Sequence, residues 1–165
     1  MKFEKISYKQ WEQDCLKLVP NMSITDIASV YDNIVLPNSS TEKSAGHDFH
    51  SPFDVDFIPE NKILIPTGIR WVPQGGYDDH TVLIICPRSG LGTKYGMRLT
   101  NTVGIIDADY CNAENEGHIM AMIEVEKNCH ISMGDKFIQG IIVPFVHCGS
   151  LNINTRTGGF GSTDN

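Results

Sequence analysis

The chain has 165 residues, of which 41% are hydrophobic and 20% charged, so it suits one packed domain and excludes wholesale disorder. Its 13 basic and 20 acidic residues give a net charge of −7, which argues against binding along a nucleic-acid backbone through bulk charge. We therefore expect no direct nucleic-acid partner. A single focused basic site for a phosphate compound remains compatible with this charge.

The cysteine content favours a cytoplasmic location. The five cysteines are odd in number and form no Cys-x-x-Cys pair, which argues against a disulfide framework or a zinc ribbon. Glu4 and Lys5 interrupt the start of the chain, so no signal peptide is expected. Residues 137–155 lack charged side chains, but Pro144 and His147 break the apolar run, so we expect no membrane span and no membrane partner.

Residues 1–31 are expected to form an N-terminal helical arm. Ser7 and Gln10 fit the two side-chain positions of a capping box, and apolar residues then recur at helical spacing as far as Leu18. Pro20 ends this helix, and Ser23 could cap a second short helix. The arm could serve as a docking surface or cover an exposed sheet edge, and the second interpretation is favoured.

Residues 32–155 are expected to form a β domain, because short and often β-branched apolar runs alternate with Gly, Pro, Asn and Asp. The predicted strands are Ile34–Leu36, Lys62–Ile65, Ile69–Val72, Val82–Cys86, Gly104–Asp107, Ile119–Val125 and Lys136–Val143. Their spacing favours an all-β sandwich or barrel over alternating βα units. Residues 156–165 are polar and glycine-rich, so we expect a flexible C-terminal tail.

Two glycine-rich segments are candidates for phosphate binding. In Pro87–Gly92, the glycine turn would let backbone N–H groups approach an anion, while Arg88 adds a planar fork and Ser89 a hydroxyl. The residues that follow could start a short helix. The second segment, Gly158–Thr163 with Arg156 ahead of it, lacks the lysine of a P-loop but could close over a ligand. Each segment alone is also compatible with an ordinary turn or chain end.

Three further segments carry acidic or amide side chains. Asp107 and Asp109 end a predicted strand, where a carboxylate beside bound phosphates would suit general-base work on water, although a metal ligand, a salt bridge or solvated surface are alternatives. Strand alternation places these two acids on one face and Tyr110 on the other, unless a turn intervenes. Asp48 could orient metal-bound water, and Gln139 could donate to phosphate or backbone.

Together and in this order, the five segments resemble the five motifs of the trimeric deoxyuridine triphosphatases (dUTPases). The matching segments are Ala45–Asp48, Pro87–Gly90, Asn101–Tyr110, Gly134–Gln139 and Arg156–Thr163. The resemblance implies a β-clip, or distorted jelly-roll barrel, assembled as a homotrimer with active sites at the subunit interfaces. It also implies hydrolysis of dUTP to dUMP and pyrophosphate, which keeps uracil out of DNA and supplies dUMP for thymidylate synthesis. Mg²⁺ would bridge the triphosphate.

The resemblance implies a role for each matching residue. Asp107 would activate the water that attacks the α-phosphorus, and Tyr110 would pack against the deoxyribose and exclude a 2′-hydroxyl. Asn101 and the strand backbone at Gly104 would read the uracil edge, which rejects other bases because their polar groups would stay unpaired. Asp48 would contact magnesium-bound water.

The remaining matches concern the phosphates and the tail. Phosphates would be held by Arg88, Ser89, Gly90 and Gln139. The tail would close over the site through Arg156, Gly159, Phe160, Gly161, Ser162 and Thr163. In this arrangement Phe160 would lie over the uracil, while Arg156 and the two hydroxyl residues would hold the distal phosphates.

The sequence departs from the family pattern at three places. Six residues, Cys111–Glu116, stand where the family has about one, and we expect them to form a longer hairpin loop at the rim of the site. Lys136 replaces the usual arginine and cannot make its planar bidentate contact. Arg156 is one residue closer to the following glycines than usual, a shift that a flexible loop could absorb.

Two alternative functions are compatible with the motifs. A dCTP deaminase shares the fold and a similar arginine-serine turn, but its base is usually glutamate, so the segments Asp107–Tyr110 and Gly158–Thr163 favour the phosphatase. A dUTPase-like trimer could also act as a regulatory binding module, with a protein partner at the arm or at Cys111–Glu116. This second alternative does not exclude hydrolysis.

Overall fold

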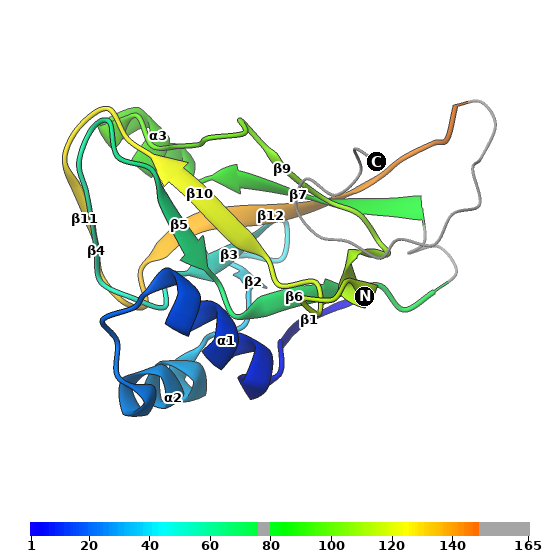
Figure 1. The fold of residues 1–165 in the computed structure, drawn as a ribbon. Coiled ribbons are helices and arrows are strands. Elements are labelled where there is room, and N and C mark those ends of the chain that lie inside the picture. Colours follow the sequence, from blue (N-terminus) through cyan, green and yellow to red (C-terminus); the bar gives the residue numbers. More distant parts are fainter. Residues whose placement is uncertain (76–79, 149–165) are drawn as a thin grey trace.

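A computed structural model describes residues 1–75 and 80–148 of the chain. The strands in these residues pair antiparallel. Within these residues the largest sheet consists, in spatial order, of β2 (Asn38–Ser39), β3 (Gly46–His50), β12 (Lys136–Pro144), β7 (Thr81–Pro87) and β9 (Gly104–Ile106). A second sheet consists of β5 (Ile63–Pro66), β10 (Met120–Glu124) and β8 (Arg98–Leu99). In Figure 1 this second sheet lies in front of the larger one.

Two ribbons complete the strand pairing of the described residues. They are β1 (Lys2–Lys5) with β6 (Ile69–Val72), and β4 (Val55–Phe57) with β11 (Cys129–Ile131). β1 runs along β6 with Lys2 opposite Val72 and Lys5 opposite Ile69, so the first strand of the chain covers this edge.

The main core lies between the two larger sheets, and the alternation of their strands supplies it. In β7 the inward positions Leu83 and Ile85 are buried, as are Ala121 and Ile123 of β10. These residues belong to one cluster, together with Phe137 and other residues of β12 and β3. The fold is therefore all-β in its core, with three α-helices among the described residues, which confirms the predicted fold class.

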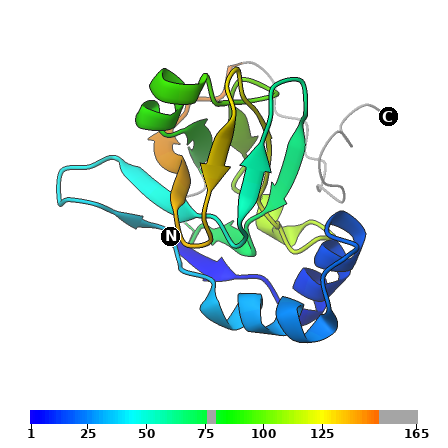
Figure 2. The ribbon, with the colours of Figure 1, turned by 90° about the vertical axis from the view of Figure 1, so that its left-hand side faces the viewer.

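The arm contains the two predicted helices, α1 (Tyr8–Leu18) and α2 (Ile24–Asn33). Both begin as predicted: the Ser7 hydroxyl accepts from the backbone N–H of Gln10, and Ser23 caps α2 in the same way. Trp11 is fully buried between the helices and donates from Nε1 to the carbonyl of Ile27 at 3.0 Å. Figure 2 shows both helices beneath the sheets, next to β1. None of the described helices has the length and apolar character needed to cross a membrane.

Most of the predicted strands form, but the one expected at Ile34–Leu36 is wrong. These residues follow the end of α2 as an irregular segment. Ile34 packs against both apolar clusters, whereas Val35 and Leu36 remain 47% and 43% exposed. Residues 34–36 therefore pack against the core through Ile34 alone and lack the alternating burial of a strand. A third helix, α3 (Ser89–Tyr95), forms after β7 where a short helix was expected.

Candidate active site

Asp48 connects two basic side chains from different parts of the chain. It lies on β3 and is only 6% exposed. One carboxylate oxygen is 3.2 Å from Nε of Arg88, and the other accepts from Nζ of Lys136 and from the hydroxyl of Ser40, both at 2.9 Å. The ammonium group of Lys136 therefore makes a point contact with Asp48, without the planar two-point contact of an arginine.

The electrostatic balance keeps Asp48 ionised. Burial favours the neutral carboxyl and acts to raise its pKa. The hydrogen bonds from Lys136 and Ser40, with the charge of Arg88, outweigh this effect and hold the pKa of Asp48 below its ordinary value. Asp48 is thus a carboxylate at neutral pH, and its contacts orient the side chains of Arg88 and Lys136.

Gln139 lies beside this cluster because of strand register. On β12 it is opposite Asp48 of β3 and opposite Cys86 of β7, and its Nε2 donates to the carbonyl of Pro87 at 3.4 Å. Gly46 lies close to this side chain, since a Cβ at that position would displace the side-chain oxygen of Gln139. Sheet pairing therefore brings together the first, second and fourth predicted segments.

An open pocket of about 790 Å³ lies in front of these segments. Its lining includes Arg88, Ser89 and Gly90 at the start of α3, and also Lys136. Lys94 and His50, which were not predicted as site residues, line the same pocket. The sequence could have indicated Lys94, because it lies in the last turn of the short helix that begins after Arg88. Clustered cations with a hydroxyl and a glycine turn suit phosphate oxygens.

Asn101 and Gly104 line a different pocket, of about 540 Å³. Apolar side chains such as Met120 and Met122 make up much of its wall. Gly104 faces Ile85 on the neighbouring strand so closely that an added Cβ would lie 3.1 Å from the isoleucine Cβ. An apolar pocket with a few polar groups suits a flat heterocycle.

A turn follows β9 and changes the predicted orientation of the next residues. Strand pairing ends at Ile106, the backbone N–H of Tyr110 donates to the carbonyl of Asp107 at 3.1 Å, and Tyr110–Asn112 form a short 3-10 helix. Strict strand alternation therefore does not apply to Asp107, Asp109 and Tyr110. Tyr110 is 3% exposed, and its hydroxyl donates to the carbonyl of His118 at 3.1 Å.

Comparisons with known proteins decide the family, since the dUTPase family model matches residues 32–164. This chain belongs to the dUTPase family. The deoxyuridine 5'-triphosphate nucleotidohydrolase of Lactococcus lactis subsp. lactis is 39% identical over 146 residues, covering 84% of this chain and 95% of that protein. The Ehrlichia canis enzyme of the same name is 36% identical over 142 residues, covering 79% and 88%.

Solved dUTPase structures agree with this assignment. The crystal structure of the dUTPase from Streptococcus mutans has a TM-score of 0.65 at 26% identity and covers 91% of this chain and 100% of that one. As a dUTPase, the protein hydrolyses dUTP to dUMP and pyrophosphate, and a dCTP deaminase is not favoured.

The inserted segment of this dUTPase differs from the predicted hairpin loop. The strands on either side of Cys111–Glu116 belong to different sheets, because β9 pairs with β7 and β10 pairs with β5 and β8. The segment contacts the arm: the Glu116 carboxylate accepts from the backbone N–H of Ser7 at 2.7 Å and from its hydroxyl at 2.5 Å. Sequence spacing gave no signal for a contact between residues 109 positions apart.

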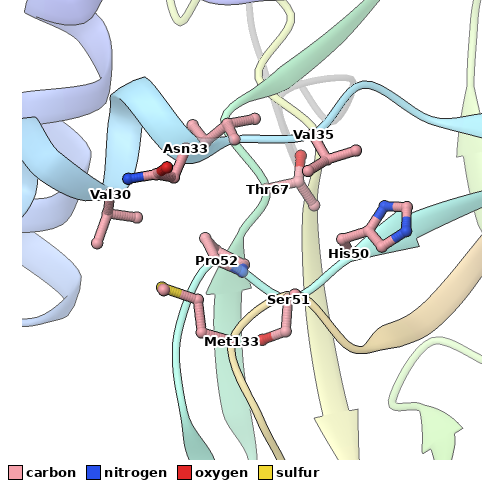
Figure 3. A pocket seen from close by; sticks show the side chains of 10 residues that line it. Val30, Asn33, Val35, His50, Ser51, Pro52, Thr67 and Met133 are labelled. Atoms are coloured by element: carbon pink, nitrogen blue, oxygen red, sulfur yellow. The ribbon is translucent and has the colours of Figure 1, made fainter.

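The other predicted residues of the site fall outside the described ranges. They are Arg156, Gly159, Phe160, Gly161, Ser162 and Thr163. A further pocket, shown in Figure 3, lies between the end of α2 and the segments around Ser51 and Met133. At about 90 Å³ it is too small for a nucleotide, and it contains none of the predicted site residues.

Proposed function

We propose that Asp107 is the general base of dUTP hydrolysis and that each active site combines residues from different subunits of a homotrimer. The observation that supports this lies along β7. Asp107 follows Ile106, whose partner Leu83 is near the start of β7, whereas Arg88 follows the end of that strand. At about 3.3 Å per residue, Asp107 and Arg88 of one chain are roughly 15–20 Å apart.

This separation matters because both residues are assigned to one triphosphate. A general base must lie within hydrogen-bond reach of the water that it activates, and a phosphate ligand must contact the substrate directly. The separation along β7 therefore favours a site that takes Asp107 from one copy and Arg88 from a neighbouring copy, and cyclic symmetry would repeat the same site at each interface.

In this reaction the chain supplies groups for each part of the substrate. Asp107 accepts a proton from a water molecule while the oxygen of that water forms the new bond to the α-phosphorus. The bond from that phosphorus to the bridging oxygen breaks, and pyrophosphate leaves. The pocket at Asn101 and Gly104 takes the uracil, and Tyr110 packs against the deoxyribose. The phosphates are held by Arg88, Ser89, Gly90 and Gln139.

Mg²⁺ fits this arrangement as a cation that accompanies the nucleotide. The described residues contain no group of three or more His, Cys, Asp or Glu side chains that could hold a metal ion. A carboxylate offers about four acceptor positions, and the three contacts of Asp48 leave room for one more donor, such as magnesium-bound water. Bound through phosphate oxygens, the ion would neutralise charge that develops on the leaving pyrophosphate.

The C-terminal segment completes the proposed site. Phe160 would cover the uracil, and phosphate contacts would come from Arg156, Ser162 and Thr163, with Gly159 and Gly161 allowing close approach. Deleting residues 158–165 should leave the trimer assembled and lower turnover at least about tenfold, because contacts that exclude water and align the triphosphate are lost. Light scattering and pyrophosphate release test the two parts of this expectation.

Two further expectations concern the cellular setting. We propose a cytoplasmic location, which is compatible with five free thiols. The two segments expected to bind a regulatory protein, the arm and Cys111–Glu116, contact each other through Ser7 and Glu116. This contact favours an internal structural role for both segments, so hydrolysis is the function that we propose.

Mixing two inactive variants tests the shared site. Asp107→Asn and Arg88→Ala trimers are unfolded, mixed in equal amounts and refolded together. Random assembly makes about three of four trimers mixed, and each mixed trimer holds one intact site of three, so about a quarter of wild-type activity should return. If both residues served the substrate within one chain, no site would be intact and the mixture would stay inactive.

A further inference from the structure

We propose that the inserted segment and helix α1 position Tyr110 and thereby set the discrimination between deoxyribose and ribose. Asn115, Glu116 and His118 are the positioning residues. The inference rests on the proposed contact of Tyr110 with the sugar. The proposal attributes part of this sugar selectivity to two segments that lie outside the five motifs: residues 1–31 and the insertion.

The hydroxyl of Tyr110 is held from two sides. It accepts from the side-chain amide of Asn115 at 2.8 Å and donates to the carbonyl of His118 at 3.1 Å. The side-chain oxygen of Asn115 accepts from the backbone N–H of Gly117 at 3.2 Å, which fixes the amide in the orientation that it needs. Because the ring is 3% exposed and its hydroxyl is anchored, a shift of the inserted segment moves Tyr110 with it.

The backbone of the insertion is bent tightly against Tyr110. Glu116 and Gly117 have φ angles of +59° and +73°, and a Cβ at Gly117 would lie 2.6 Å from Cα of Cys111 and 2.8 Å from the carbonyl oxygen of Tyr110. A left-handed φ is unfavourable for glutamate, so other contacts must offset it. The paired hydrogen bonds from the N-cap residue Ser7 to the Glu116 carboxylate supply such contacts.

His118 connects the same segment to α1. The backbone N–H of Gly68 donates to Nε2 at 2.8 Å, so this nitrogen carries the lone pair and the proton lies on Nδ1. Nδ1 then donates to the Asp14 carboxylate at 2.6 Å. His118 is fully buried, and its own carbonyl accepts from Tyr110. His118 therefore joins three parts of the chain: its imidazole contacts helix α1 and the backbone before β6, and its carbonyl contacts the tyrosine hydroxyl.

These contacts form one continuous path from the arm to the proposed sugar-binding residue. Asp14 and Asn115 also line the pocket that contains Asn101 and Gly104, so the path borders the proposed uracil site. A ring fixed in this way can exclude a 2′-hydroxyl more strictly than a ring held by packing alone, because a ribose could otherwise displace it.

The test compares kcat/KM for dUTP with kcat/KM for UTP. Loss of folded enzyme scales both values equally, so their ratio responds to positioning and not to stability. Asn115→Ala should lower the ratio about 3- to 10-fold, the effect of one ordinary hydrogen bond, and Tyr110→Phe, which breaks two, should lower it at least as much. The double variant should lower the ratio no further than Tyr110→Phe alone, because phenylalanine leaves no hydroxyl for Asn115 to hold. Glu116→Ala should also lower the ratio, because it removes the hydrogen bonds from Ser7 that hold the inserted segment against the arm.

Matched controls lie in the same segment. Asn112→Ala and Glu114→Ala make the same substitutions at exposed positions and should leave the ratio unchanged. The proposal is overturned if Tyr110→Ala collapses the ratio while Tyr110→Phe, Asn115→Ala and Glu116→Ala retain it. If Tyr110→Ala itself leaves the ratio unchanged, the proposed sugar contact fails and this inference fails with it. Tyr110→Phe leaves the inserted segment intact, so the test stands even if Asn115→Ala does not fold.

Discussion

Replacing Asp48 with asparagine tests how the phosphate-binding side is built. The change keeps the size of the side chain and removes its charge. Asp48 is 6% exposed and accepts from Lys136, Ser40 and Arg88 within 2.9–3.2 Å. An amide offers one oxygen in place of two and turns an N–H₂ group toward other donors. Hydrogen bonds to charged groups contribute about 1.5–3 kcal/mol each when buried.

The net cost should be smaller than the sum of these bonds. The lysine and arginine side chains are 33% and 41% exposed, so water replaces part of what they lose. We expect Asp48→Asn to lower the free energy of unfolding by about 1–3 kcal/mol. We also expect a raised KM for dUTP, because Arg88 and Lys136 are no longer oriented.

Urea unfolding at one fixed protein concentration measures the stability change, since assembly makes stability depend on concentration. Asp56→Asn is the matched control, because its carboxylate is 85% exposed and pairs with His130 at the surface. If Asp48→Asn lowers the free energy of unfolding no more than Asp56→Asn does, the buried contacts of Asp48 do not stabilise the fold.

The pH dependence gives a second check on the same variant. The pKa of Asp48 is lower in the folded chain than its ordinary value, because hydrogen bonds from Lys136 and Ser40 and the charge of Arg88 outweigh the opposing effect of burial. A carboxyl of this kind stabilises the fold above its unfolded pKa of about 4, and the contribution is lost as pH falls through the folded pKa. The stability difference between wild type and Asp48→Asn should therefore be constant near neutral pH and shrink in acid.

Three further predictions concern other parts of the chain. Asp107→Asn should retain binding of a non-hydrolysable dUTP analogue and lower turnover about 10²–10⁴-fold; near-normal pyrophosphate release would exclude Asp107 as the base. Gly68→Ala should lower the melting temperature more than Gly75→Ala: both have positive φ, but a Cβ at Gly68 meets the side chain of Ile34, whereas one at Gly75 meets none of the described residues. Burial raises the pKa of Cys15 to about 12, so iodoacetamide at pH 8 should label exposed Cys148 and spare Cys15 in the folded protein.

Local patterns in the sequence predicted much of the fold. Ser7 and Ser23 marked the starts of two helices because capping depends on residues within one turn. The apolar run at Val82–Cys86 predicted β7, and its burial alternates as expected for a strand between neighbours. The strand expected at Ile34–Leu36 failed because apolar character alone does not distinguish a strand from a segment that packs through one side chain.

Contacts between distant segments could not be predicted. β1 (Lys-Phe-Glu-Lys) is too short and too polar to predict a strand, and it forms one by pairing with β6. The motif resemblance indicated Asp48 and Gln139 as site residues, but only strand register showed that they are opposite each other. The link between Glu116 and Ser7 depends on a left-handed backbone at the insertion, for which a glutamate gives no sequence signal.

Product analysis of purified protein with Mg²⁺ and each of dUTP, dCTP, dTTP and UTP tests whether the chain is a dUTP hydrolase. We expect equimolar dUMP and pyrophosphate from dUTP, far slower hydrolysis of the other nucleotides, and no ammonia from dCTP. Ammonia release from dCTP, or dUTP left intact while another nucleotide is consumed, would contradict it.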